Sequence, residues 1–330
     1  MENLKVTVVG AAGRMGSLIV QLIKEADDVS FFGAVEKEIC PMPGAERTFF
    51  SSTSNIIALR EIFQESDVII DVSSTENIGE RISLAVELGK ALVIGTTGLS
   101  EDEKNCLRKA AEKIPCVLAP NFSVGANSIF ELVARAAMLL GSEYQIEIVE
   151  AHHDQKKDAP SGTANRLAEV IAGVREQELE DVACYGRHGM GSSRPKGQIG
   201  IHSLRASDVV GEHTIIFFGR GERVELAHKV TSRVAFAEGA VRAARWVVKQ
   251  KPGLYDMQDV LGLNPKKEYV ADVFSVAEVA SILRKSKKWV YRNMGVIPGS
   301  YKLGRRIFFD QKLFESGLKN MASHLADTAS

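Results

Sequence analysis

The chain has 330 residues, of which 45% are hydrophobic and 25% are charged, and its formal net charge at pH 7 is −1. This composition is typical of a globular protein with two or three domains, and no apolar run approaches the roughly 20 residues that cross a bilayer. The chain opens without a basic segment followed by an apolar one, and its four cysteines lack C-x-x-C spacing. We therefore expect a protein of the reducing cytoplasm, with no secretory signal and no membrane contact.

The N-terminal segment predicts a strand, a glycine-rich turn and a helix. Residues 4–9 are rich in β-branched side chains, Gly10, Gly13 and Gly16 follow, and apolar residues then recur at helical spacing. Glycines in this context allow a tight turn, the approach of a pyrophosphate to the backbone and close packing of the helix on the sheet. The G-x-x-G-x-x-G spacing departs from the usual G-x-G-x-x-G pattern, so a tight turn in another kind of α/β protein is the alternative.

The next predicted strand, residues 29–35, bears on the choice of dinucleotide. It leads to Glu36, which lies 20 residues after Gly16, about where an acidic side chain binds the hydroxyl groups of the adenosine ribose. The charge of Glu36 favours NADH, whereas Lys37 and Arg14 could bind the 2′-phosphate of NADPH. The sequence therefore predicts a dinucleotide cofactor and leaves the choice between NADH and NADPH open.

Strands and helices continue to alternate up to residue 119. Strands are predicted at residues 67–72, 91–95 and 116–119, with helices at residues 76–88 and 101–112 between them. Such unbroken apolar strands belong to a parallel sheet that is covered on both faces. Ligands bind at the carboxyl ends of these strands, so the Gly-Thr-Thr-Gly turn at residues 95–98 and the Pro-Asn-Phe-Ser turn at residues 120–123 are candidates for the wall of a nicotinamide site. Both turns could also cap the helices that follow.

The remainder of the body predicts an α+β domain with an antiparallel or mixed sheet. Its expected elements are helices at residues 124–140, 163–174 and 231–249, and strands at residues 144–149, 199–204, 213–218 and 223–230. Residues 184–198 are rich in glycine and have no clear period, so they predict a mobile loop. Residues 253–262 close this body.

Residues 150–163 contain the densest group of side chains suited to a site. His152, His153 and Lys156 precede a Pro-Ser-Gly-Thr turn, and the segment joins a predicted strand to a predicted helix. The backbone amides of residues 161–163 at the start of that helix predict an anion site beside the lysine. Adjacent histidines at a strand end point to opposite faces, and no third ligand follows at metal spacing, so we predict no metal ion.

Several motifs occur in the order found in one enzyme family. They are Gly-Ala-Ala-Gly-Arg-Met-Gly at residues 10–16, Gly-Thr-Thr-Gly, Pro-Asn-Phe-Ser, Glu-Ala-His-His at residues 150–153 and Lys-Lys-Asp-Ala-Pro-Ser-Gly-Thr-Ala at residues 156–164. On these motifs, residues 1–264 closely resemble the 4-hydroxy-tetrahydrodipicolinate reductase (dihydrodipicolinate reductase) family of the diaminopimelate route to lysine. The resemblance implies a dinucleotide-binding domain at residues 1–123 and 234–264. It also implies that residues 124–233 bind a dicarboxylate substrate and build a homotetramer.

The resemblance also implies roles for individual residues. Hydride addition to a conjugated imine leaves an enamine that must gain a proton on carbon, and a histidine can supply that proton near neutral pH. By motif, His152 is the implied acid and Lys156 its cationic partner. The residues implied to bind the substrate carboxylates are His153, Lys156, Ser161, Gly162 and Thr163. The residues expected to face NADH or NADPH are Gly10, Gly13, Arg14, Met15, Gly16, Glu36, Lys37, Gly95, Thr96, Thr97, Pro120, Asn121 and Phe122.

Residues 265–330 extend beyond the resemblance and differ from the body in charge. They contain 12 Lys and Arg against 6 Asp and Glu, whereas residues 1–264 contain 29 against 36. A basic module on an acidic body indicates an anionic partner. The expected elements are a helix at residues 275–283 that opens on a capping box of Ser275 and Glu278, a helix at residues 287–294 capped by Ser286, a hairpin at residues 301–309 and a helix at residues 310–318.

This order of short helices and a basic hairpin resembles the excisionase-like winged helix-turn-helix module. The resemblance implies DNA binding through residues 275–318. The implied contacts are Lys287, Lys288, Tyr291 and Arg292 on the recognition helix, and Arg305 and Arg306 against phosphate. A helical appendage used in assembly is the alternative for this tail. For the whole chain, the first hypothesis is a reductase, and the second is a DNA-binding regulator that uses the reductase body as a metabolite or redox sensor.

Overall fold

The structure is a computed structural model that describes residues 3–36, 47–48, 56–263, 273–303, 306–310, 313–314 and 316–318. The chain forms two compact units, Met1–Leu261 and Gly262–Ser330. Two of the residues expected at ligand sites, Lys37 and Arg305, lie outside the described residues. Within the described part of the chain, no helix is both long enough and apolar enough to cross a membrane.

A parallel sheet of seven strands forms the first part of the larger unit. Its strand order is β12-β6-β5-β4-β1-β2-β3, and each of its strand pairs is parallel. The strands are β1 (Leu4–Val9), β2 (Val29–Val35), β3 (Arg47–Thr48), β4 (Val68–Asp71), β5 (Ala91–Ile94), β6 (Pro115–Leu118) and β12 (Gly253–Tyr255). The order reverses at β1, so the sheet is doubly wound and Rossmann-like, which confirms the predicted fold class.

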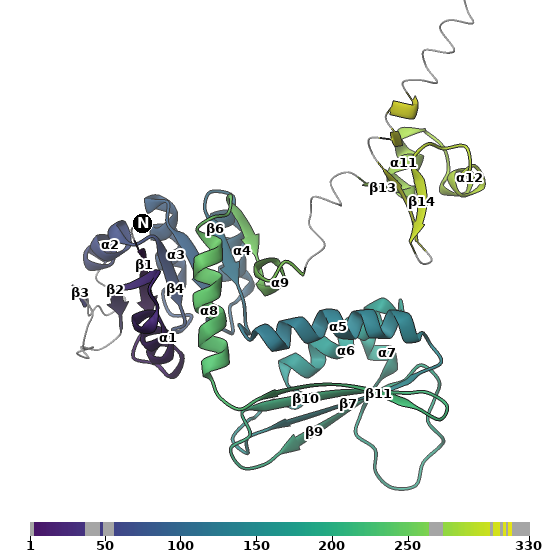
Figure 1. The fold of residues 1–330 in the computed structure, drawn as a ribbon, viewed down its shortest axis with the longest axis horizontal. Helices are drawn as coiled ribbons and strands as arrows, with labels where there is room; N and C mark the ends of the chain where they lie inside the picture. The colour runs from purple at the N-terminus through teal and green to yellow at the C-terminus, as the bar shows by residue number, and fades with distance from the viewer. Residues whose placement is uncertain are drawn as a thin grey trace, which may run out of the picture. The chain divides into compact units, whose positions relative to one another are not determined.

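Helices cover both faces of this sheet (Figure 1). The helices are α1 (Arg14–Glu25), α8 (Val234–Val247) and α9 (Met257–Val260) on one face, and α2 (Ile56–Glu65), α3 (Ile78–Leu88) and α4 (Glu101–Ala111) on the other. Alternate residues of a strand point to opposite faces, so Val8 and Ile70 join the first core while Val9 and Ile69 join the second. Burial on both faces explains why these strands are apolar throughout.

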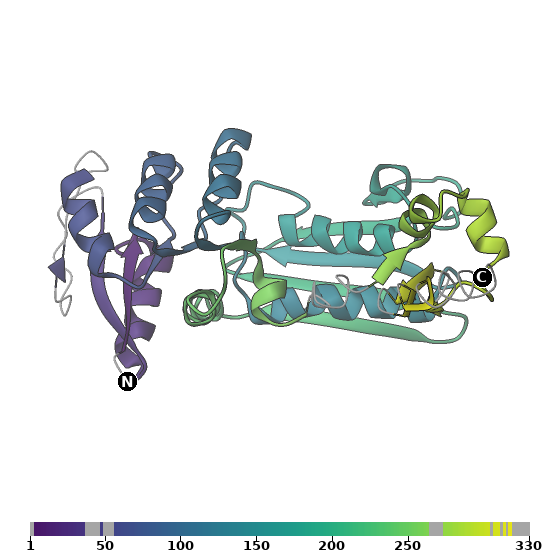
Figure 2. The same cartoon turned by 90° about the horizontal axis from the view of Figure 1, so that it is seen from above.

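A mixed sheet of five strands completes the larger unit, in the order β11-β10-β7-β9-β8. The strands are β7 (Gln145–His152), β8 (Ala183–Tyr185), β9 (Ile199–Arg205), β10 (Gly211–Phe218) and β11 (Arg223–Val230). β10 pairs antiparallel with β7 and β11, whereas β9 pairs parallel with β7 and β8. Figure 2 shows α5 (Val124–Leu140) and α6 (Gly162–Val174) lying along one face, where they enclose a core that includes Ile148, Leu167 and Phe217. The short helix α7 (Leu179–Val182) follows α6.

Most predicted elements are confirmed, and the differences lie at short or irregular segments. α8 begins at Val234 instead of residue 231, because residues 231–233 connect it to β11. The segment expected to be a loop from residue 184 starts with the last residues of β8. α2 was not predicted, although Leu59 and Phe63 place apolar side chains at helical spacing. β12 has three residues, which is too few for a periodic signal.

β7 carries the centre of the candidate site. Its buried positions alternate, and they are Ile146, Ile148, Glu150 and His152. Residues i and i+2 of a strand share a face, so the face that supplies two isoleucines to the core ends in a carboxylate and an imidazole. The strand was expected to end at residue 149, and that boundary was wrong. His152 is the last residue of the strand and not part of the loop that follows it.

The smaller unit has a core of its own. β13 (Val273–Ser275), β15 (Arg306–Asp310) and β14 (Ser300–Leu303) form an antiparallel sheet in that order. Helices α11 (Val276–Ile282) and α12 (Lys287–Arg292) contribute Val279 and Val290 to a core that also contains Phe309. The two predicted helices and the hairpin are confirmed, while β13 was not predicted. Of the last expected helix, the structure describes residues 313–314 and 316–318, which are helical.

Candidate functional site

A buried carboxylate stands at the end of β7. The side chain of Glu150 is 0% exposed, and Arg205 on β9 donates to both of its oxygens, over 2.9 Å from Nη1 to Oε2 and 2.8 Å from Nη2 to Oε1. Arg205 is the register partner of His152 across the two parallel strands, which brings the guanidinium to the carboxylate. His152 Nδ1 lies 2.5 Å from Oε2, and the amide of Ser161 donates to Oε1 over 3.3 Å. One carboxylate therefore joins two strands to the start of α6.

These contacts decide which groups carry charge. Burial raises the pKa of a carboxyl group, but hydrogen bonds from Arg205, Ser203 and His152 outweigh it and lower the pKa of Glu150 to about 2. The pKa of His152 is lowered, because burial disfavours the imidazolium more than Glu150 favours it. Near neutral pH the carboxylate is therefore ionised and the imidazole is neutral.

Ser161 caps α6 and lies against a second buried histidine. Its Oγ accepts the amide proton of Ala164 over 3.2 Å and is 3.0 Å from Nε2 of His213. His213 is 4% exposed, and burial lowers its pKa to about 4. The rings of His152 and His213 meet edge to face, with centroids 5.2 Å apart. The N-terminus of α6 is thus anchored beside the imidazole at the end of β7.

Lys156 and His153 occupy the segment between β7 and α6. The Nζ of Lys156 pairs with Oδ1 of Asp158 at 2.9 Å, and the lysine side chain is 22% exposed. Its positive charge contributes to the lowered pKa values of His152 and His213, so it lies near both rings. The half-buried His153 accepts the amide proton of Lys156 through its carbonyl oxygen, over 3.2 Å. Both residues therefore lie at the same corner of the mixed sheet as the buried carboxylate.

A side-chain contact links this corner to the carboxyl end of the parallel sheet. Asn121, in the turn after β6, donates from Nδ2 to Oγ1 of Thr163 over 3.5 Å. The turn is fixed by two further bonds, because Oδ1 of Asn121 accepts the amide of Ser123 at 2.9 Å and its carbonyl oxygen accepts from Nδ2 of Asn127 at 2.9 Å. The turn expected beside the nicotinamide and the turn expected to bind an anion at the start of α6 are thus neighbours.

The glycine-rich turn has a shape that fits a dinucleotide. Gly10 has φ +81°, and a Cβ on Gly16 would lie 2.0 Å from the carbonyl oxygen of Gly10. Among the described residues no side chain caps α1, and its first turn contains no acidic residue, which suits the approach of a phosphate. Glu36 accepts a hydrogen bond from the amide of Ala12 and so stands beside the turn. Of the other residues expected there, the exposed ones are Gly13 and Arg14, and the half-buried one is Met15.

Two of the residues expected to face the dinucleotide have buried side chains. Thr96 donates from Oγ1 to Oδ1 of Asp71 over 3.0 Å. Phe122 is 4% exposed and packs against Gly95, where an added Cβ would lie 2.5 Å from the ring. We interpret both side chains as supports that hold the backbone of the two turns. The exposed residues of these turns include Thr97 and Pro120.

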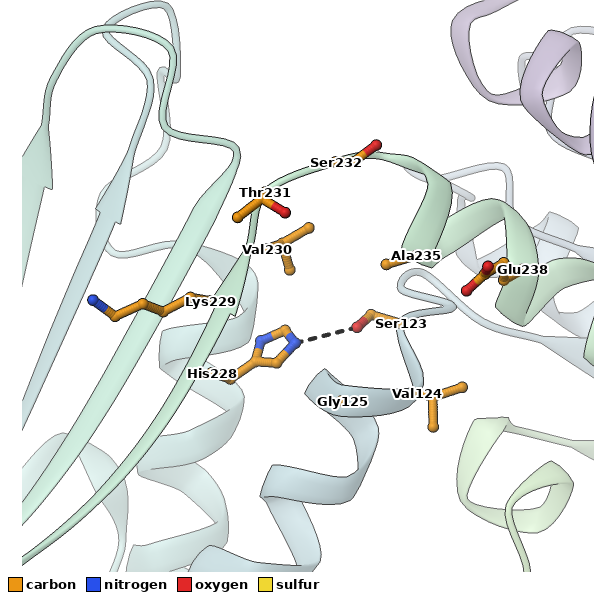
Figure 3. Close-up of a pocket in the computed structure, with 10 residues that line it drawn as sticks. All are labelled: Ser123, Val124, Gly125, His228, Lys229, Val230, Thr231, Ser232, Ala235 and Glu238. Carbon is orange, nitrogen blue, oxygen red and sulfur yellow. Dashed lines mark hydrogen bonds between the residues drawn. The ribbon is translucent and has the colours of Figure 1, made fainter.

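A surface cavity of about 240 Å³ lies elsewhere, between the start of α5, the end of β11 and the start of α8 (Figure 3). His228 projects into this region, and its Nε2 is 3.3 Å from Oγ of Ser123. Gly125 leaves space for that ring, because a Cβ there would lie 2.7 Å from it. Ser123, the last residue of the turn expected beside the nicotinamide, lines the cavity, and its other lining residues lie outside the expected site. We interpret it as part of the junction where the chain passes between the two sheets.

The sequence did not single out three members of the buried cluster. Glu150 belongs to the quoted motif but received no role, and its signal was a carboxylate at a position that alternates with core isoleucines. Arg205 and His213 lie in segments that read as ordinary strands. Their relation to His152 depends on the pairing of β7 with β9 and β10, which local sequence patterns do not reveal.

Comparisons with known proteins agree with this geometry. The family model described as "Dihydrodipicolinate reductase, N-terminus" matches residues 4–122, and the one described as "Dihydrodipicolinate reductase, C-terminus" matches residues 125–261. The chain is 47% identical over 264 residues to the 4-hydroxy-tetrahydrodipicolinate reductase of Syntrophus aciditrophicus (strain SB), covering 78% of this chain and 98% of that relative. It is 47% identical over 268 residues to the protein of the same name from Anaeromyxobacter dehalogenans (strain 2CP-C), covering 80% and 99%.

A solved structure extends the similarity to three dimensions. The dipicolinate-bound dihydrodipicolinate reductase from Paenisporosarcina sp. TG-14 superposes with a TM-score of 0.64 at 26% sequence identity. The match covers 78% of this chain and 99% of that one. The residues matched by the two family models fall within the larger unit described above.

The buried His213 predicts stability that is sensitive to acid. Its folded pKa of about 4 lies below the ordinary 6.5, so between these pH values the unfolded chain binds more protons and stability falls as the pH falls. His213→Gln removes this titration, so the wild type should lose up to about 1.4 kcal/mol per pH unit relative to the variant across that interval. Urea unfolding at several pH values measures the difference. Parallel pH profiles would contradict it, and the exposed His188→Gln should follow the wild type.

Proposed function

The chain belongs to the dihydrodipicolinate reductase family, and we propose that residues 150–163 form its catalytic and substrate-binding segment. The protein is an oxidoreductase that uses NADH or NADPH to reduce 4-hydroxy-tetrahydrodipicolinate (dihydrodipicolinate) to tetrahydrodipicolinate, in the diaminopimelate route to lysine. One observation carries the assignment of the segment. An imidazole, a lysine and the N-terminus of a helix meet at one corner, next to a turn at the carboxyl end of the Rossmann-like sheet.

The glycine-rich turn is the proposed cofactor site. The amides at the start of α1 would hold the pyrophosphate, and Glu36 would bind the adenosine ribose. When bound, the dihydronicotinamide supplies a hydride. The turn after β6 would form the wall on the substrate side, because Asn121 already reaches the N-terminus of α6 through Thr163.

The substrate carboxylates are proposed to bind at the start of α6. The backbone amides of Gly162 and Thr163 and the positive end of the helix dipole favour an anion there. Lys156, which pairs with Asp158 in the single chain, would add a positive charge for a substrate carboxylate. His153, at the beginning of the same segment, would complete this set.

His152 is proposed to supply the proton of the reaction. Reduction of the conjugated imine takes up one hydride and one proton, and the proton must reach a ring carbon of the substrate. Burial lowers the pKa of His152, but a bound dianion stabilises the imidazolium and raises its proton affinity. The position of His152 at the strand end, close to the start of α6, supports this role, because a substrate anion bound there would lie near the imidazole.

Replacing His152 by Gln should therefore affect turnover more than binding. We expect kcat to fall by about 10²- to 10⁴-fold, the usual contribution of a general acid, with a much smaller change in KM. Steady-state rates with NADH and with NADPH measure both constants. His188→Gln, at an exposed position in the loop after β8, is the matched control and should keep the wild-type kcat. An unchanged kcat in His152→Gln would remove the proposed acid.

We also propose that the chain forms a homotetramer through the mixed sheet. α5 and α6 cover one face of this sheet, whereas Val149 and Ile216 alternate with buried residues and point to the other face, which Leu204 shares through its pairing with Ala151. Leu204 is 54% exposed in the single chain. This face also carries the Glu147–His202 ion pair, and a mixed face with exposed apolar side chains suits an interface between copies of the chain.

A charge on the uncovered sheet face should break the assembly. We expect the full-length chain to sediment at about four times 36.0 kDa, and Ile216→Arg to sediment as a smaller species. Ile57→Arg, on α2 at a position 70% exposed, introduces the same charge elsewhere and should remain tetrameric. A monomeric wild type, or a tetrameric Ile216→Arg variant, would contradict this interface.

For the smaller unit we propose DNA binding through α12. Val290 faces the core of this unit, and the same short helix exposes Lys287, Lys288, Tyr291 and Arg292. Lys285 lies over the ring of Trp289, 5.7 Å from its centroid, and adds a further cation beside the helix. This concentration of positive charge on one helix favours phosphate contacts over an assembly role.

Charge reversal on α12 tests this role directly. Lys288→Glu with Arg292→Glu should weaken binding of mixed-sequence duplex DNA to the full-length chain. It should also reduce the slope of log K against log salt by about 2, one unit per lost phosphate contact. Lys109→Glu with Lys113→Glu makes the same charge change on exposed residues of the larger unit and should leave binding unchanged. Fluorescence anisotropy measures both, and equal affinity for the two double variants would contradict the proposal.

A further inference from the structure

The fully buried carboxylate of Glu150 pairs with the partly buried guanidinium of Arg205 beside His152, and neither residue has a role in the proposed reaction. We infer that both are positioning residues, which hold the imidazole so that Nδ1 keeps its hydrogen and Nε2 alone exchanges a proton with the substrate. This inference rests on the proposed role of His152 as the acid. It adds the two side chains that decide which nitrogen reacts and at which pH.

The donors around Glu150 fix the tautomer of His152. An ionised carboxylate offers only acceptors, and Oε1 already receives Nη2 of Arg205 at 2.8 Å and the amide of Ser161 at 3.3 Å. Oε2 receives Nη1 of Arg205 at 2.9 Å and faces Nδ1 of His152 at 2.5 Å. Because Nδ1 faces an acceptor, it carries a hydrogen in both the neutral and the charged ring. The proton that is gained and lost therefore resides on Nε2.

The surroundings of Nε2 suit this role. Gly211, the first residue of β10, lies beside that nitrogen, and a Cβ there would be 3.1 Å from it. A larger residue at this position would crowd the reacting nitrogen, whereas glycine leaves space next to it. A carboxylate therefore holds the ring of His152 at Nδ1, while the absence of a side chain on Gly211 leaves space at Nε2.

Charged and titratable groups from several segments surround His152. The titratable and charged groups that face it are Glu150 from β7, Arg205 from β9, His213 from β10, and Lys156 with its partner Asp158 from the segment before α6. Burial lowers the pKa of His213 to about 4, so this ring is neutral near neutral pH. Lys156 also lowers the pKa of His152, so the fixed charges that act on this ring are the anion of Glu150 and the cations of Lys156 and Arg205.

Glu150 and Arg205 act on His152 with opposite signs. Without Arg205, the uncompensated carboxylate would favour the imidazolium and raise the pKa of His152. Without Glu150, the uncompensated guanidinium would lower that pKa, and Nδ1 would lose its acceptor. If either residue had a purely structural role, its loss would reduce kcat or stability. Loss of Arg205 and loss of Glu150 would then not move the pKa of His152 in opposite directions.

The test is the pH dependence of kcat for the full-length enzyme and its variants. The rate should fall with rising pH as the acid loses its proton. We call this fall the alkaline limb of the profile. We expect Arg205→Met to move the midpoint of the limb to higher pH by about one unit or more, and Glu150→Gln to move it to lower pH by about as much. Arg205→Lys retains the positive charge and should leave the limb near its wild-type position. Melting curves by circular dichroism identify the variants that are folded.

The outcomes separate this inference from the proposed function. If both substitutions leave the limb in place, or shift it in the same direction, the positioning role is overturned. If the wild type shows no reductase activity, or the limb persists in His152→Gln, the acid role itself fails. Should Arg205→Met not fold, Glu150→Gln decides alone, because it preserves the size of the side chain. A downward shift in that variant supports the inference, and any other result overturns it.

Discussion

A carboxylate that has no contact with solvent must be compensated by charge and by hydrogen bonds, and Glu150 is compensated by Arg205, His152 and the amide of Ser161. The three donors come from β9, β7 and the cap of α6, so the orientation of the imidazole, the strand pairing and the position of the anion turn depend on one another. Loss of one partner leaves a buried charge without compensation, which is costly, and this couples the geometry of the site to the stability of the sheet.

The two sheets of the larger unit approach each other at the carboxyl end of the doubly wound sheet, where a dinucleotide and a substrate would have to be adjacent for hydride transfer. The doubly wound sheet presents its turns at the carboxyl ends of β5 and β6, which is where such folds bind ligands. Asn121 in the second turn reaches Thr163 on α6, so a dinucleotide at the first sheet would lie next to an anion at the second. The buried Phe122 and Thr96 hold the turns from beneath. Turns held by such contacts suit hydride transfer, which requires closely defined distances.

Most helices and strands and the position of the candidate site could be predicted from the sequence, because they depend on local sequence patterns. Apolar strands alternate with amphipathic helices, and the glycine turn and the histidine segment each lie within one short stretch. The partners of Glu150 and the shortest strands could not be predicted, because they depend on contacts between distant parts of the chain. Arg205 reaches Glu150 only because β9 pairs with β7, 55 residues apart along the chain. Three-residue strands such as β12 and β13 carry no periodic signal, since their pairing with distant partners decides their conformation.

The central claim is that this chain reduces a cyclic unsaturated dicarboxylate with a hydride from NADH or NADPH at the corner formed by β7 and α6. The most direct measurement is the rate of NADH or NADPH oxidation by the purified full-length chain, with and without enzymatically generated dihydrodipicolinate. The account predicts oxidation that depends on the dicarboxylate, saturates with it and yields tetrahydrodipicolinate. Oxidation no faster with the dicarboxylate than without it, in a folded protein that binds the dinucleotide, would contradict it.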